Sequence, residues 1–246
     1  MKTLLHKLLY RTLPLKGYLR AVSRMFFLWQ RLGIGRYAPA TEYVYHLPQL
    51  VHAGDTVVDI GANLGYYTRT LSRLVGSQGA VYAVEPVPPI LEVLRHNVRG
   101  CRNVEILPYA LGLENKEIRM ANDSARETGY FGTGQNFVNE SNATSEIEFS
   151  AQMRRGSELF STLKHLDFIK CDIEGYEVVV MGELRPLLER FHPTVLIETG
   201  GDNRRQIVAL FTQMGYRGLL LDRGAEIPYT EASTKDLIFR YKKLCE

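Results

Sequence analysis

Residues 56–68 read TVVDIGANLGYYT, and this stretch decides the fold. The run Thr56–Ile60 is mostly β-branched, which predicts a buried strand, and the residues from about Gly65 to Val75 predict a helix. Gly61 and Gly65 lie between strand and helix, where glycine permits a tight turn and the close approach of a ligand. A strand, a glycine turn and a helix in this order are typical of the ligand-binding edge of an α/β sheet.

The alternation of strand and helix continues along the chain. After Thr56–Ile60, six more strands are predicted at Ala80–Val84, Val104–Leu107, Phe168–Ile173, Thr194–Ile197, Gly218–Asp222 and Asp236–Tyr241. Helices are expected over Pro88–Val98, Glu177–Phe191 and Arg204–Met214. Because such alternation favours right-handed crossovers, we predict an α/β fold with a mostly parallel, seven-stranded sheet flanked by helices.

One interval does not follow this alternation. Residues 113–156 are polar and rich in glycine, with short strand-like pieces at Glu117–Met120 and Glu146–Met153. The interval follows the third predicted strand, so it leaves the sheet near its ligand-binding edge. We interpret it as a flap on the substrate side, with a disordered loop as the alternative.

The amino-terminal segment differs in charge from the rest. Residues 1–36 carry eight lysines and arginines and no acid, which leaves 22 basic and 27 acidic residues in the remainder. Apolar residues recur at helical spacing on either side of Pro14, so we expect residues 1–40 to form a basic, amphipathic helical extension of a domain spanning 41–246. This extension either packs on the domain or lies on an anionic membrane surface. Nucleic acid is not an expected partner, because the body is acidic and shows no second basic patch.

The composition bounds the class of protein. A chain of 246 residues with 45% hydrophobic and 23% charged residues is globular, which excludes disordered and collagen-like chains. Cys101, Cys171 and Cys245 are widely spaced and form no CxxC pair, so we expect a reducing, cytoplasmic location, with peripheral contact at the inner face of a membrane as an addition. No apolar run approaches the ~20 residues of a membrane span.

The glycine spacing indicates what kind of ligand is bound. The loop reads GxxxG, whereas the dinucleotide fingerprint is GxGxxG, so the cradle for a pyrophosphate is incomplete. Glu85 ends the second predicted strand, where a carboxylate can accept hydrogen bonds from the hydroxyls of a ribose. The pattern favours a nucleoside ligand without a pyrophosphate over the dinucleotide of an NAD-dependent oxidoreductase.

Three runs together resemble the FkbM-type methyltransferases, class I enzymes with a Rossmann-like fold that use S-adenosylmethionine. They are Asp59–Gly65 (DIGANLG), Val84–Pro86 (VEP) and Asp167–Glu177 (DFIKCDIEGYE). The resemblance covers about residues 50–200, but neither the extension nor the flap, and its most specific part is Lys170–Glu177. It implies that Gly61, Ala62, Asn63 and Gly65 line the methionine end of the cofactor and that Asp59 reaches its amino group, directly or through a water molecule. It further implies that Glu85 holds the ribose, that Pro86 stacks near the adenine, and that Tyr109 and Ala110 lie beside it. Thr68 completes the cofactor-binding candidates.

Acidic residues end two neighbouring predicted strands. Asp172 and Glu174 end the fourth strand and Glu198 the fifth, so the three carboxylates converge at one edge, where like charges raise at least one pKa. We expect Asp172 to face the methyl group as a general base, while Glu174 and Glu198 orient the acceptor or share that role. The structural alternative is that Glu174 and Glu177 cap the next helix and that Glu198 pairs with Lys170. No metal is expected; an alternative magnesium set comprises Asp172, Glu198, Asp202 and Asn203.

The resemblance implies transfer of a methyl group to a hydroxyl oxygen on a sugar, a glycolipid or another secondary metabolite. The expected partner is therefore a small-molecule or glycan acceptor, and residues 1–36 would suit one carried by a membrane. Three alternatives stay open: an amine acceptor, which needs no base; a nucleotide-binding oxidoreductase; and a non-catalytic cofactor-binding module at a membrane.

Overall fold

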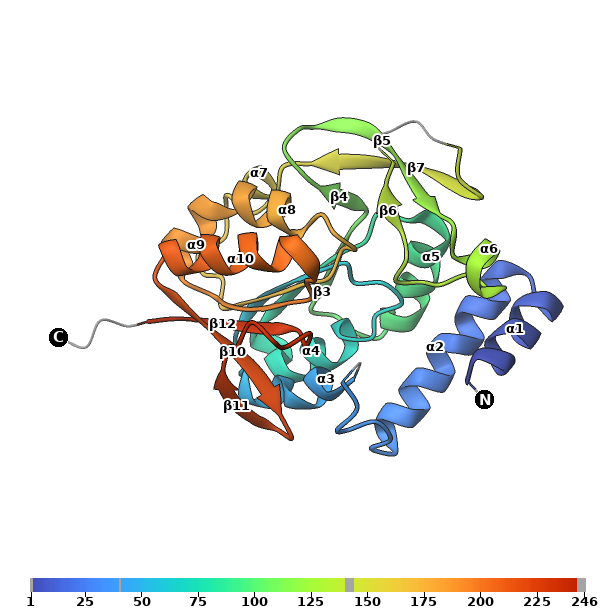
Figure 1. The fold of residues 1–246 in the computed structure, drawn as a ribbon, viewed down its shortest axis with the longest axis horizontal. Coiled ribbons are helices and arrows are strands. Elements are labelled where there is room, and N and C mark those ends of the chain that lie inside the picture. The colour runs from blue at the N-terminus through green and yellow to red at the C-terminus, as the bar shows by residue number, and fades with distance from the viewer. Residues whose placement is uncertain (1, 40, 140–143, 243–246) are drawn as a thin grey trace.

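The computed structural model describes residues 2–39, 41–139 and 144–242. Within them, the main sheet has eight strands in the order β11-β10-β12-β9-β8-β1-β2-β3. Strands β11, β10 and β12 lie together at one side of this sheet (Figure 1). Their bounds are β1 Thr56–Ile60, β2 Ala80–Val84, β3 Val104–Leu107, β8 Phe168–Cys171, β9 Thr194–Ile197, β10 Tyr216–Asp222, β11 Ala225–Pro228 and β12 Leu237–Tyr241. The five strands from β3 to β9 are parallel, and β12, β10 and β11 are antiparallel to their neighbours. The predicted α/β sheet is confirmed.

The predicted number of strands was one too low. The additional strand, β11, pairs with β10 across a two-residue turn of Arg223 and Gly224, which have φ of 48° and 87°. Positive φ at both positions suits the twist of a tight hairpin. The sequence of β11, AEIP, carries no alternating apolar pattern, because three of its four residues are exposed. It extends the sheet on the side away from the predicted site.

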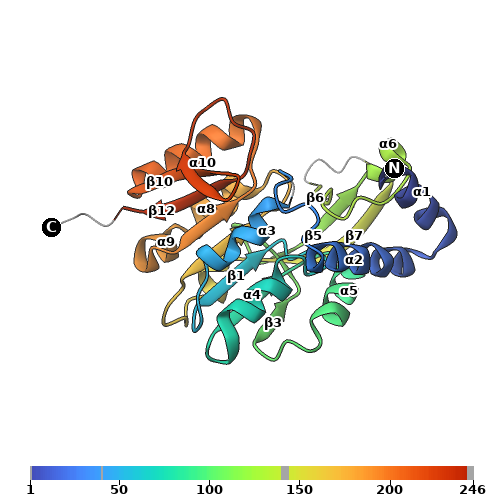
Figure 2. The same cartoon turned by 90° about the horizontal axis from the view of Figure 1, so that it is seen from below.

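The helices cover both faces of the sheet. On one face lie α3 Glu42–His46, α4 Thr68–Val75 and α5 Pro88–Val98, and on the other lie α8 Glu177–Glu183, α9 Arg185–Phe191 and α10 Gly201–Gln213 (Figure 2). The short helices Leu47–Gln49 and Gly76–Gln78 follow α3 and α4. Because the chain moves from β1 to β3 in one direction and from β8 to β9 in the other, right-handed crossovers place the two sets on opposite faces.

The predicted helix Glu177–Phe191 is two helices in the structure. The first ends at Glu183, and Pro186 lies in the first turn of the second. Proline has no N–H to donate, so it is accepted at a helix start and disfavoured in a helix interior.

The interval after β3 forms a second sheet in its described residues. Its strands are β4 Tyr109–Leu111, β5 Lys116–Asn122, β6 Phe137–Val138 and β7 Ile147–Arg154. In space they are ordered β4-β7-β5-β6. The antiparallel pair β5–β7 runs from Lys116↔Met153 to Asn122↔Ile147. The short helices α6, Ser124–Thr128, and α7, Gly156–Leu159, complete this region. We call residues 109–156 the flap; it begins at β4, slightly before the predicted start, and the alternative of a disordered loop is wrong for its described part.

The amino-terminal extension consists of α1, Lys2–Thr12, and α2, Leu15–Arg31, on either side of Pro14. The second helix buries Tyr18, Leu19 and Val22 against a core that it shares with α5 and the flap. The Tyr18 hydroxyl donates to the Phe131 carbonyl oxygen at 3.0 Å. The packing interpretation thus holds for α2, and no helix among the described residues is both long and apolar enough to cross a membrane.

Candidate active site

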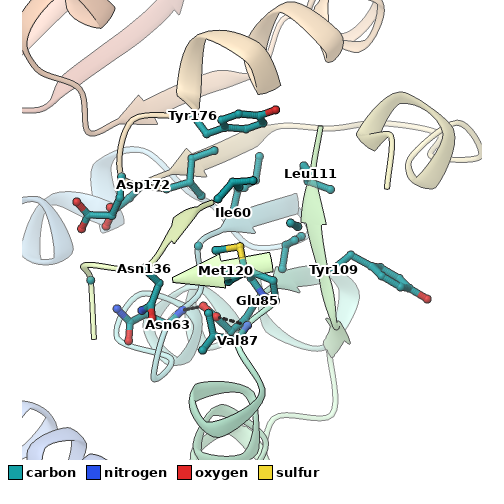
Figure 3. A pocket seen from close by; sticks show the side chains of 18 of the residues that line it. Ile60, Asn63, Glu85, Val87, Tyr109, Leu111, Met120, Asn136, Asp172 and Tyr176 are labelled. Atoms are coloured by element: carbon teal, nitrogen blue, oxygen red, sulfur yellow. Dashed lines mark hydrogen bonds between the residues drawn. The ribbon is translucent and has the colours of Figure 1, made fainter. Parts of the chain in front are cut away.

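A cavity lies at the carboxyl ends of β1, β2 and β8, and the flap closes it from the opposite side (Figure 3). The strand ends contribute Ile60, Glu85 and Asp172, and the flap contributes Met120 and Asn136. The empty space between them is about 610 Å³, part of which is open to solvent. The flap therefore covers the predicted cofactor site itself.

Glu85 is fixed at one end of this cavity. Its Oε2 accepts from the Asn63 N–H and its Oε1 from the Val87 N–H, both at 2.9 Å (Figure 3). Burial raises the pKa of Glu85 to about 7, although the two backbone hydrogen bonds act in the opposite direction. A carboxylate has roughly four lone-pair sites, so each oxygen keeps capacity for a further donor. A held acid with free acceptor sites suits a pair of ribose hydroxyls.

The structure requires glycine at the two loop positions for different physical reasons. At Gly61, with φ +73°, an added Cβ would lie 1.9 Å from the Asp172 carbonyl oxygen, so the loop can approach β8 only with glycine there. At Gly65, with φ +86°, an added Cβ would lie 3.1 Å from the Leu94 side chain. Gly61 and Asn63 line the cavity, whereas Ala62 and Gly65 do not. Ala62 packs against α5 instead, so the structure does not bring these two predicted contacts to the cofactor cavity.

Asp59 and Thr68 lie behind the loop. The Thr68 hydroxyl donates to Asp59 Oδ2 at 2.6 Å, and Lys170 Nζ lies 3.8 Å from Asp59 Oδ1. Lys170 also donates to the Gly61 carbonyl oxygen at 2.8 Å. Both predicted contacts are fully buried and neither lines the cavity, so in this structure they support the loop from below. Burial raises the pKa of Asp59, and the neighbouring ammonium opposes that shift.

Three residues were expected beside the adenine of the cofactor. Pro86, Tyr109 and Ala110 all line the cavity. The ring of Tyr109 extends away from the other labelled side chains (Figure 3), and the Arg154 guanidinium lies 5.5 Å from its centroid. The part of Tyr109 nearest the cavity is thus not its ring face.

A second cavity adjoins the first at Asp172, which lines both. Its polar residues are Lys170, Asp172, Glu198 and Asp236, and its aromatic residues are Phe26, Tyr66 and Tyr67. Phe26 comes from α2, and its ring centroid is 4.2 Å from that of Tyr66. The amino-terminal extension therefore forms part of a wall of the site, which the sequence did not indicate.

Carboxylates crowd the second cavity. Burial raises the pKa of Glu198 to about 8, with further contributions from the charges of Asp172 and Asp236 and from a hydrogen bond shared with Asp172. Two carboxyl groups can share a hydrogen bond only if one of them carries a proton. Solvent still reaches Glu198, which weakens the repulsion without reversing it. Lys170 Nζ lies 3.3 Å from Asp172 Oδ2 and supplies the compensating positive charge.

Asp236 is a site residue that the sequence reasoning missed. Its pKa is raised to about 7 by burial and then by the charge of Asp172. It precedes β12, which is antiparallel to β9, so the start of β12 lies at the same edge as the ends of the parallel strands. An acid immediately before the closing strand was the available signal.

Glu174 and Glu177 have separate roles. Glu177 Oε1 accepts from the N–H groups of Ile173 at 3.2 Å and Gly175 at 3.0 Å, so this buried side chain holds the turn before α8. Glu177 is thus structural, but it holds the turn and does not cap α8, since both hydrogen bonds come from residues before the helix. Glu174 lines the first cavity at its rim, and its pKa is raised to about 7 by burial and then by Asp172. In the described residues, the ion pairs of Lys170 are with Asp59 and Asp172, not with Glu198.

The alternative magnesium set does not assemble. Asp202 is exposed and pairs with Arg205 at 3.5 Å, and the Asn203 side-chain amide donates to the Gly175 carbonyl oxygen at 2.8 Å. Among the residues that the structure describes, no group of three or more His, Cys, Asp or Glu side chains has the arrangement of a metal site.

The parallel strands, the glycine loop after β1 and the buried acid at the end of β2 define a class I methyltransferase fold and site. The chain belongs to the FkbM methyltransferase family, whose domain model, the methyltransferase FkbM domain, matches residues 59–217. The cofactor that goes with this family domain is S-adenosylmethionine. The first cavity fits this group, since Glu85 keeps acceptor sites for the ribose and Ile60, Val84 and Leu111 offer an apolar wall.

Known proteins resemble the chain over limited lengths. It is 30% identical over 80 residues to a protein-L-isoaspartate O-methyltransferase of Ignicoccus hospitalis, covering 31% of this chain and 38% of that protein. It is 38% identical over 77 residues to the Aeropyrum pernix protein of the same name, covering 30% of each. The match thus spans about a third of these relatives. The crystal structure of methyltransferase FkbM from Methylobacillus flagellatus KT has a TM-score of 0.51 at 14% identity, covering 78% of this chain and 45% of that one, and shows the shared fold.

Proposed function

We propose that this enzyme transfers the methyl group of S-adenosylmethionine to a hydroxyl oxygen of an acceptor bound in the second cavity. The observation that carries the proposal is the position of Asp172, which lines both cavities and lies beside Glu198 and Lys170. A group at the junction of two cavities can contact an acceptor oxygen as it approaches a methyl group.

The residues around the junction have two tasks. The bound cofactor supplies an activated methyl group, so the protein must align the acceptor, which contributes roughly 7–11 kcal/mol in well-oriented reactions. An alcohol must also lose its proton, and a positioned base contributes about 10²–10⁴-fold. We assign this proton to the Asp172–Glu198 pair, since Glu198 has a pKa near 8 and shares a hydrogen bond with Asp172. Glu174 lines the first cavity and not the second, so we assign it an orienting role only for the part of the acceptor that reaches past Asp172 toward the methyl group.

The lining of the second cavity favours a sugar-like acceptor. Aromatic rings, here Phe26 and Tyr66, pack against the apolar faces of sugar rings, and carboxylates accept hydrogen bonds from hydroxyls. An isoaspartyl acceptor, suggested by the names of the relatives, is less suited, because its own carboxylate would enter a cavity with three others. A sugar, a glycolipid or another polyhydroxylated metabolite fits better.

An amine acceptor is the second candidate. Three carboxylates face one lysine in the second cavity, which would attract a cationic amine. An amine that loses its proton to solvent needs no base, so substitution of Asp172 separates the two candidates.

The compartment is also a proposal. Cys101 and Cys171 are free thiols, and Cys245 lies outside the described residues, which supports a reducing, cytoplasmic location.

The direct test is product formation. The full chain is incubated with S-adenosylmethionine and matched panels of free sugars, nucleotide sugars, glycolipids and amines, and S-adenosylhomocysteine is measured by mass spectrometry. We expect product with hydroxyl acceptors that falls in Asp172→Asn and persists in the control Asp202→Asn, whose side chain lies outside both cavities. Product with amines alone would overturn the hydroxyl proposal, and cofactor binding without product from any panel would favour the non-catalytic alternative.

A further inference from the structure

One face of the molecule gathers positive charge from segments far apart in the sequence. It is formed by α2, α4 and residues 88–102, and α2 lies along α5 (Figures 1 and 2). We call it the basic face. These segments contain one acid, Glu92, which pairs with Lys16. Their cationic residues are Lys16, Arg20, Arg24, Arg31, Arg69, Arg73, Arg95, Arg99 and Arg102.

The basic face corrects an expectation from the sequence. The body is acidic in total, yet it has a second basic patch that joins the extension in space. Arg69 and Arg73 are four residues apart on α4, and Arg95 and Arg99 are four apart at the end of α5, so each pair points to one side. Folding brings these pairs next to the arginines of α2.

A groove runs through this face. Arg31, Arg69, Arg73 and Arg102 line it together with Phe27, and no aspartate or glutamate does. The Arg69 guanidinium lies 4.2 Å from the centroid of the Phe27 ring, which holds its charge at the groove. Within the described residues, none of these four arginines forms an ion pair with a carboxylate. Such a groove needs anions from outside the chain.

Exposed apolar side chains lie beside the groove. Leu28 and Leu32 on α2 are 55% and 63% exposed, and Ile34 just after the helix is 51% exposed. Leu28 and Leu32 directly follow Phe27 and Arg31 in the chain, about 100° further round the helix. Cations flanked by exposed leucines are the composition of a surface that lies in the headgroup region of an anionic membrane. A nucleic acid would use the arginines and leave the leucines without a role.

We propose that the basic face docks on an anionic lipid bilayer, with lipid phosphates in the arginine groove and Leu28, Leu32 and Ile34 inserted among the headgroups. Phe26, one residue from the groove-lining Phe27, lines the second cavity. Docking through α2 therefore brings the acceptor cavity next to the membrane. The docking itself stands independently of which acceptor is methylated.

The test is co-sedimentation of the full chain with vesicles of phosphatidylcholine alone or mixed with phosphatidylglycerol, at low and high salt. We expect binding to the anionic vesicles only, weakened by salt. In Arg69→Gln/Arg73→Gln, affinity should fall roughly 30-fold, from about 1 kcal/mol for each basic residue. The matched control is Arg190→Gln/Arg205→Gln, which removes the same charge from α9 and α10; Arg190 also stacks on a ring, 4.5 Å from the Phe191 centroid. The control should bind like the unaltered chain.

A second variant tests the apolar part. Leu28→Ser/Leu32→Ser should weaken vesicle binding most at high salt, where the electrostatic attraction is screened. Equal losses in the two arginine variants, or equal binding to both kinds of vesicle, would overturn the proposal. Displacement of the protein from vesicles by inorganic phosphate would also overturn it, because it would indicate a site for free anions. Tighter binding to RNA than to vesicles, unchanged in the leucine variant, would overturn it as well. Stabilisation by S-adenosylhomocysteine, measured in every variant, shows that the fold and cofactor site persist, so failure of docking is distinct from failure of catalysis.

Discussion

The two cavities that meet at Asp172 are built from different parts of the chain. The first takes its polar groups from the ends of β1, β2 and β8, all inside residues 59–217 that match the family. The second adds Phe26 before this range and Asp236 after it. Under the proposed function the first cavity is the cofactor side, and it lies within the matched residues; the second cavity is the acceptor side, and it also takes residues from outside them.

The largest expected effect is at the junction. Asp172→Asn should lower the turnover rate by about 10²–10⁴-fold, because the acceptor loses its base, while the affinity for S-adenosylhomocysteine changes little. Single-turnover rates and calorimetry measure the two quantities. Since the change also removes a partner of Lys170, Glu198→Gln is a second variant that leaves the Lys170–Asp172 contact in place. Unchanged rates in both variants would contradict the division between the cavities and favour an amine acceptor.

The second largest expected effect is on cofactor binding in the first cavity. Glu85→Gln replaces one acceptor oxygen with an NH₂ group that faces the N–H of either Asn63 or Val87. We expect the dissociation constant of S-adenosylhomocysteine to rise roughly 10- to 100-fold, the range for hydrogen bonds to charged groups. Glu174→Gln, at the rim of the same cavity, is the matched control and should bind almost normally. Equal losses in both would mean that Glu85 has no special part in holding the ribose.

The cofactor side was largely predictable from the sequence, for a physical reason. Strands β1, β2, β8 and β9 are mostly buried and mostly apolar, and an acid directly after such a strand must lie at the carboxyl edge. Glu85 and Asp172 were found in this way. The runs do not reveal which side chains lie behind the loop, and four of the expected cofactor-binding residues, Asp59, Ala62, Gly65 and Thr68, do not line the cavity.

The acceptor side was less predictable, because its residues meet only through tertiary packing. Phe26 follows the same helical spacing as the buried Leu19 and Val22, so the pattern marks an apolar face without identifying what it covers. Asp236 is brought to the site by an antiparallel strand whose direction the pattern does not fix. For the same reason the sequence did not predict the basic face, whose arginines come from three separate segments of the chain.

The pH dependence of catalysis tests the role of Glu198, which lines only the second of the two cavities. Its pKa is raised to about 8, so below this pH it carries a proton and cannot accept one from the acceptor. We expect kcat/KM to rise about tenfold from pH 7 to pH 9, because the ionised fraction rises by that factor. In Glu198→Gln this rise should disappear. Ionisation of Glu198 should not change the affinity for S-adenosylhomocysteine, so the variant and the unaltered protein should bind it equally at each pH. A profile that is identical in the variant would assign the base elsewhere.

The smallest expected effect tests whether α2 belongs to the acceptor side. Phe26→Ala removes a ring that packs 4.2 Å from Tyr66 and lines the second cavity, so the KM of a soluble acceptor should rise roughly three- to tenfold, with little change in kcat. Phe27→Ala is the matched control, since Phe27 lines the arginine groove and not this cavity. With a soluble acceptor it should keep a normal KM, but it should bind anionic vesicles less well. If both variants alter KM equally, α2 acts only by supporting the fold; if Phe26→Ala alone does so, one helix contributes to the acceptor site through one side chain and to the basic face through the next.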